Sequence, residues 1–64
     1  MLNHRDKWLV YHQHKRELLA LSLPPARQLQ WAELELRLAV MQNRFLMVAL
    51  ALHWAHQIHV NYGV

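Results

Sequence analysis

Two adjacent prolines, Pro24 and Pro25, are the strongest break in a chain that otherwise suits helices and has only one glycine. Proline is tolerated in the first turn of a helix, but in the interior it removes a hydrogen bond and clashes with the preceding turn. The residue before a proline is also driven out of the helical conformation. We therefore expect a first helix over about residues 4–22, a turn at 23–25 and a second helix over about residues 25–60.

The second expected helix carries the clearest periodic pattern in the sequence. Its apolar seam has alternating spacings of three and four residues and comprises Trp31, Leu34, Leu38, Met41, Phe45, Val48, Leu52, Ala55 and His59. Such a seam is typical of antiparallel hairpins and coiled-coil-like packing. The sequence thus predicts one all-α domain over residues 1–64, a two-helix antiparallel hairpin with a short first helix and a long second helix.

The two expected helices differ in length, and the difference leaves apolar surface uncovered. At 1.5 Å per residue the first helix would measure about 28 Å and the second about 53 Å. The first helix would then reach only to about Arg44, and the segment from Phe45 to Ile58 would lie beyond it. That segment is apolar around its whole circumference, and such helices are normally buried on all sides. We expect a protein partner or a second copy of the chain to cover it.

The uncovered segment supplies the predicted partner-binding residues, which are Phe45, Val48, Leu50, Leu52, Trp54 and Ile58. Trp54 is the expected hot spot, because buried aromatic anchors dominate interface energetics. Trp31, near the turn, is expected in the intramolecular core. In the alternative arrangement the second helix bends, or breaks near Gln42–Asn43 and folds back as a third helix, although no glycine or proline marks such a break.

Size and charge narrow the function classes. A 64-residue chain forms at most one small domain, and domains of this size are only marginally stable. The absence of cysteine excludes a disulfide framework and a cysteine-based zinc site. The net charge of +3 is spread along the chain, without a dense basic block for nucleic acid. We expect no secretory signal and no membrane span, because the longest strictly apolar run, residues 45–52, is far too short.

Residues that could carry chemistry are few. The carboxylates are Asp6, Glu17, Glu33 and Glu35. The single serine lies beside the turn, and the sequence has no phosphate-binding loop or nucleophile motif, so we expect no enzyme activity, no cofactor and no small-molecule substrate. His53, His56 and His59 repeat at intervals of three, which turns them progressively around a helix. We therefore favour an interface or surface role for these histidines over a metal site.

One stretch of the sequence resembles a known family of helical hairpins. The segments that carry the resemblance are Lys15-Arg16-Glu17-Leu18, Leu23-Pro24-Pro25 and Gln28-Leu29-Gln30-Trp31. Over about residues 8–52 they resemble the YscE/PscE/EscE-type small co-chaperones of type III secretion systems. The resemblance implies a cytoplasmic protein whose second helix docks on a larger helical-repeat chaperone, and the pair would shield the needle subunit from premature polymerisation. The uncharged, histidine-rich C-terminal end departs from the family's pattern.

Two functional hypotheses follow. The first is a small non-catalytic protein-binding module, in its specific form a type III secretion co-chaperone. The alternative is a self-assembling four-helix-bundle dimer that acts as a small regulator, in one version with nucleic acid as its partner.

Overall fold

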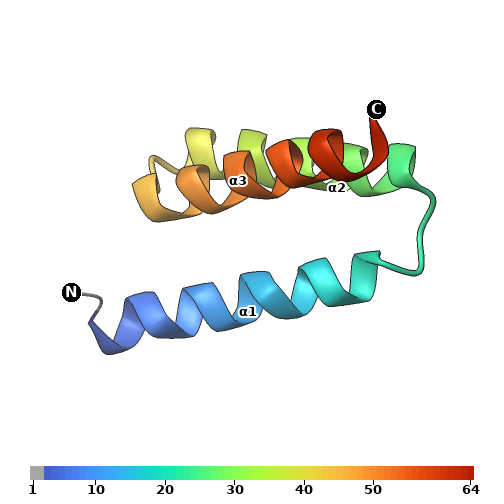
Figure 1. Cartoon of the computed structure of the whole chain (residues 1–64). Helices are drawn as coiled ribbons and strands as arrows, with labels where there is room; N and C mark the ends of the chain where they lie inside the picture. The colour runs from blue at the N-terminus through green and yellow to red at the C-terminus, as the bar shows by residue number, and fades with distance from the viewer. Residues whose placement is uncertain (1–2) are drawn as a thin grey trace.

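The computed structural model describes residues 3–64 and consists of three helices (Figure 1). These are α1 (His4–Ala20), α2 (Pro25–Met41) and α3 (Phe45–Tyr62). Strands are absent from the described residues, which confirms the all-α expectation. The two-helix count is wrong, because the long helix predicted over residues 25–60 is two helices joined by a reversal.

α1 begins with a capped first turn and ends before the proline pair. The side chain of Asn3 accepts a hydrogen bond from the backbone N–H of Asp6 at 2.8 Å, which satisfies one of the free donors at the helix start. Beyond the helix end, the hydroxyl of Ser22 donates to the carbonyl oxygen of Leu19 at 3.0 Å. Pro25 lies in the first turn of α2, where its missing N–H costs nothing.

The chain reverses at residues 42–44. Asn43 has φ 56°, in the left-handed region that asparagine tolerates better than most residues. Its backbone N–H donates to the carbonyl oxygen of Val40 at 3.1 Å, and the N–H of Arg44 donates to that of Ala39 at 3.0 Å. These two bonds form a Schellman motif, which ends α2 and satisfies its last carbonyl groups.

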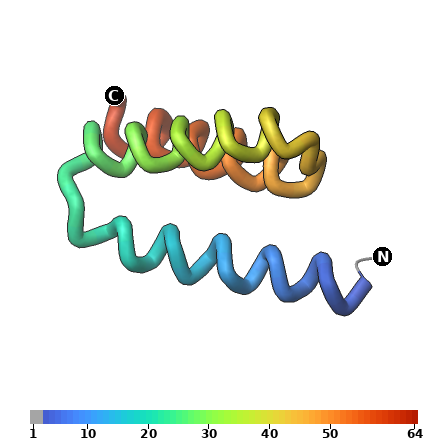
Figure 2. The backbone as a smooth tube through the Cα atoms, turned by 180° about the vertical axis from the view of Figure 1, so that it is seen from behind, coloured from blue at the N-terminus to red at the C-terminus, as the bar shows by residue number. Residues whose placement is uncertain are grey.

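α2 and α3 lie side by side and antiparallel, and α1 runs alongside this pair as a separate arm (Figures 1 and 2). α2 and α3 form the main helix–helix contact, and α1 makes a smaller contact with α3. The start of α1 lies at the same end of the molecule as the reversal, while the C-terminus lies near the α1–α2 connection. The reversal therefore forms an exposed end of the α2–α3 pair.

The core is small and built largely from alanine. Its central cluster consists of Ala20, Ala32, Trp54 and Ile58, with Leu29, Trp31 and Ala55 packed against it. Ala39 and Ala51 are also buried. Alanine in a helix–helix contact lets two helices approach closely but buries little apolar area per residue. The large apolar side chains that would normally fill a core are therefore left for the surface.

Candidate partner-binding surface

The predicted apolar seam is largely on the surface of the chain. Five of its large side chains are exposed, and we call them the exposed seam: Leu34, Leu38, Met41, Phe45 and Leu52. Met41 and Phe45, which flank the reversal, are 81% and 83% exposed. Because a single exposed leucine is ordinary but a repeated apolar pattern at the surface is not, this set is the main candidate for a binding surface.

The packing between helices uses positions one residue away from the seam. The buried residues of the two helices are Gln28, Ala32, Ala39, Ala51, Trp54 and Ile58. On α2 the shift is one residue forward, from Trp31 to Ala32. On α3 it is one residue back, from Ala55 to Trp54. The reversal breaks the continuous register, so the seam no longer faces a single neighbour, and the small alanines face inward instead.

The six predicted partner-binding residues fall into three groups in this structure. Phe45 and Leu52 are exposed, and Val48 and Leu50 are half-buried. Trp54 and Ile58 lie in the core of the single chain, so this arrangement does not offer them to a partner. Trp54 contacts Trp31 instead, with ring centroids 5.6 Å apart.

Two surface residues at the reversal were not among the predicted site residues. Val40 and Met41 end α2 and are both exposed, at 60% and 81%. The sequence carried one signal for them, Asn43, because asparagine is the second choice after glycine for the residue that follows a helix end. Neither glycine nor proline, the two commonest helix breakers, occurs near this position, so Asn43 is the one local indication of the helix end.

The hairpin tip, defined here as Val40, Met41, Arg44, Phe45 and Val48, contains a hollow of about 200 Å³. Four of these residues line it together with Asn43, all except Met41. Pockets for small molecules usually measure about 300–1,000 Å³. A hollow of this size suits a protruding side chain of another protein better than a small-molecule ligand.

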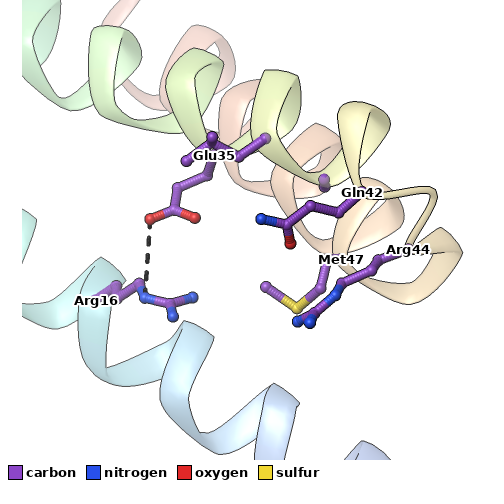
Figure 3. A pocket seen from close by; sticks show the side chains of 7 residues that line it. Arg16, Glu35, Gln42, Arg44 and Met47 are labelled. Carbon is purple, nitrogen blue, oxygen red and sulfur yellow. Dashed lines mark ion pairs between the residues drawn. The ribbon is translucent and has the colours of Figure 1, made fainter.

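A second hollow, of about 280 Å³, lies between α1 and the α2–α3 pair (Figure 3). It is lined by Arg16, Glu35, Leu38, Ala39, Gln42, Arg44 and Met47. Arg16 Nε of α1 faces Glu35 Oε1 of α2 at 3.8 Å, and Figure 3 shows Arg44 and Met47 on the opposite side of the same space. A partly exposed ion pair of this kind contributes only about 0–1 kcal/mol. Polar contacts across this space therefore hold α1 only weakly.

α1 carries several large apolar side chains on its outward side. Its buried residues are Gln13 and Ala20, and its exposed apolar residues are Trp8, Tyr11, Leu18 and Leu19, followed by the exposed C-cap residue Leu21. The side-chain nitrogens His12 Nε2 and Gln13 Nε2 are buried without a hydrogen-bond partner among residues 3–64. Such unpaired groups weaken the contact between α1 and the α2–α3 pair.

The exposed charges are almost all of one sign. Within residues 3–64 the exposed basic residues are Arg5, Lys7, Lys15, Arg27, Arg37 and Arg44, and Glu33 is the single exposed carboxylate. Glu35 is half-buried, where it accepts a hydrogen bond from Trp31 Nε1 at 3.2 Å and pairs with Arg16. The most exposed charges are therefore mainly cationic, in keeping with the net charge of +3.

The described part of the chain offers little support for a metal site or a membrane-spanning helix. Residues 3–64 contain no group of three or more histidine, aspartate or glutamate side chains placed to hold a metal ion. None of the described helices combines the length and hydropathy needed to cross a bilayer. Comparison with protein-family models, curated proteins and solved structures finds no match to this chain.

Proposed function

We propose that this chain is a small, non-catalytic helical module that binds another protein through the exposed seam of α2 and α3. The observation that carries the proposal is the exposure of Met41 and Phe45, both above four-fifths, at the free end of the helix pair. Large aromatic and flexible sulfur-containing side chains suit the centre of a protein interface.

The energetics support a bound state. Burying about 600 Å² of apolar surface would supply roughly 15 kcal/mol before the costs of association and side-chain ordering. The single chain has a small alanine-rich core, and many of its large apolar side chains are exposed, so we expect the free energy of unfolding of the isolated chain to be low. A partner that covers the exposed seam would stabilise the folded chain by mass action.

In the specific form of this proposal, the partner is a helical-repeat chaperone of a type III secretion system. This form is supported by the resemblance over residues 8–52 and by the exposed face of α2 formed by Leu34, Leu38 and Met41. α3 has no counterpart in the two-helix hairpin that the resemblance implies. The general proposal, a protein-binding module, does not depend on this specific partner.

Co-purification from the source cells, followed by mass measurement of the intact complex, tests the proposal. The experiment compares the tagged wild-type chain with Met41→Asp/Phe45→Asp, which places two charges in the exposed seam. The matched control is Gln30→Asp/His53→Asp, with two charges at exposed polar positions of the same helices. We expect wild type and control to recover one partner at fixed stoichiometry, and the seam variant to lose it while its helical circular dichroism is unchanged.

Three results would contradict the proposal or redirect it. Recovery of the partner by the seam variant as by the wild type would remove the exposed seam as the binding surface. A wild-type chain that is monomeric in the cell extract would contradict a binding function. A complex with the mass of two identical chains would favour the self-assembled dimer instead.

A further inference from the structure

We infer that the hairpin tip binds an acidic amphipathic helix of a different protein. This inference rests on the proposed function and adds the chemistry of the partner. It comes from three features of the tip: a side-chain-sized hollow, an apolar centre and a rim whose charges are cationic.

The rim of the tip carries one exposed arginine, Arg44, and no exposed acid lines the same hollow. Arg44 lies at the reversal itself. The carboxylate of Glu35 is turned inward toward Trp31 and Arg16. α3 contains no aspartate or glutamate along its whole length. Glu33, the single exposed carboxylate of residues 3–64, lines a different hollow on α2 beside Arg37.

Charge complementarity determines whether the contacting residues of the partner are acidic or basic. Interfaces pair an apolar centre with a polar rim, and complementary charges in the rim steer association and select partners. Arginine binds carboxylates through two parallel hydrogen bonds, so Arg44 favours glutamate or aspartate beside the apolar contact. A partner with lysine or arginine at those positions would be repelled.

The same charges disfavour a second copy of this chain at the tip. A two-fold dimer places the same patch on both sides of the interface, so the tip of one copy would meet a tip that also carries Arg44 and no exposed acid. The rest of the surface offers little compensation, because six exposed basic residues are set against one exposed carboxylate, Glu33, and the half-buried Asp6 and Glu17 within residues 3–64. An acidic chain meets no such repulsion.

The shape of the tip favours a protein helix over other polyanions. The hollow of about 200 Å³ between Val40, Phe45 and Val48 accepts one protruding apolar side chain. An amphipathic helix supplies such a side chain and repeats it after three or four residues, so that neighbouring anchors reach Met41. A phosphate backbone has charge but no such side chain, and it would leave the apolar centre without a partner.

Binding of two designed peptides to the full chain tests this inference. Each peptide spans about three heptads with leucine at the a and d positions. One carries glutamate at e and g, and the other carries lysine there. Fluorescence anisotropy of the labelled peptides, at concentrations where each is monomeric, gives the dissociation constants. We expect the chain to bind the glutamate peptide at least tenfold more tightly, with a preference that shrinks as salt is added.

Charge reversal in the chain localises the preference. Arg44→Glu should reverse the preference for the glutamate peptide, and Arg44→Gln, which removes the charge, should reduce it. Arg27→Glu makes the same charge reversal at the far end of α2 and should leave the preference unchanged. Circular dichroism of every variant checks that the helices are intact, and the milder Arg44→Gln variant guards against misfolding of Arg44→Glu.

The outcomes separate this inference from the proposed function. Equal binding of the two peptides, or tighter binding of the lysine peptide, would overturn the acidic partner while leaving the apolar seam as a docking surface. Binding of neither peptide would also overturn it, and the co-purification experiment would still decide whether the chain binds a partner. A glutamate peptide with alanine in place of leucine that binds as tightly would reduce the interaction to charge alone, which contradicts the role given to the tip.

Discussion

The indole rings of Trp31 and Trp54 meet edge to face, with ring centroids 5.6 Å apart and planes inclined by 65°. Trp54 is 3% exposed, while Trp31 is half-buried and donates its indole N–H to Glu35 at 3.2 Å. Aromatic pairs in this geometry contribute about 0.5–1.5 kcal/mol beyond the burial of their area. The pair joins the first half of α2 to the second half of α3, and it packs Trp31 against an otherwise alanine-rich core.

Replacement of Trp54 by alanine should nearly unfold the chain. Loss of a buried tryptophan costs about 3–5 kcal/mol, which is comparable to the whole stability expected of a small domain. Urea denaturation followed by circular dichroism measures the change in free energy of unfolding. We expect Trp54→Ala to lack a cooperative transition or to unfold at much lower urea concentration.

The matched control for this prediction is Trp8→Ala. Trp8 is exposed, and its ring lies against that of His12 with centroids 3.9 Å apart and planes tilted by 55°. Its removal should change the free energy of unfolding by less than about 1 kcal/mol. Equal losses from the two substitutions would mean that Trp54 is not the core residue described above.

Substitutions at Asn43 should report on the reversal. Glycine adopts the left-handed conformation freely, whereas a β-branched residue there is strained by about 1–2 kcal/mol. We expect Asn43→Gly to leave the free energy of unfolding unchanged or to raise it slightly, and Asn43→Val to lower it by about 1–2 kcal/mol. Thermal and urea unfolding give both values. A more stable valine variant would indicate that residues 42–44 are helical instead.

An apolar residue of similar size at Gln13 should stabilise the chain. Gln13 is 1% exposed, and its side-chain nitrogen is buried without a hydrogen-bond partner within residues 3–64. Removing the unsatisfied nitrogen relieves about 1–3 kcal/mol, which outweighs the loss of the long hydrogen bond, 3.4 Å, that Arg16 Nη1 donates to Gln13 Oε1. Methionine has a similar shape and adapts to the space. We expect Gln13→Met to raise the free energy of unfolding by about 1 kcal/mol. Gln30→Met, at an exposed position, is the control and should change it by less than about 0.5 kcal/mol. A loss of stability in Gln13→Met would show that the amide is better satisfied than it appears from its contacts.

The helix limits around the prolines could be predicted because their cause is local. Pro24 and Pro25 fix their own backbone and that of Leu23, whatever the rest of the chain does. The reversal at Asn43 could not be predicted in the same way. Asparagine does not force a left-handed conformation, so the choice between one long helix and two depends on whether α3 gains more by packing on α2.

The sequence predicts that the candidate site is apolar, but it does not predict which apolar residues are buried between the helices and which are exposed. The apolar excess after Arg44 is visible in the sequence, and part of it, Phe45 and Leu52, is on the surface. The periodic pattern assigned the largest side chains to one packing seam, yet the residues buried on α2 are Gln28, Ala32 and Ala39. Periodicity identifies residues that share a helix face, but a chain rich in both leucine and alanine has two candidate faces, and tertiary packing decides between them.

The reversal at residues 42–44 is the feature on which the proposed function depends most, because it places Met41 and Phe45 at a free end and turns the seam outward. A distance between spin labels at Gln30→Cys and His53→Cys tests it directly. Both positions are exposed, and the chain has no other cysteine.

Pulsed electron–electron double resonance measures the distance between the two labels. The doubly labelled chain is diluted with unlabelled chain to exclude distances between molecules. Packed antiparallel helices have axes about 8–10 Å apart, so α2 and α3 should hold the labels within about 20 Å of each other. A distance near 35 Å, the length of a continuous helix between the two positions, would contradict the hairpin and the exposed seam that it creates.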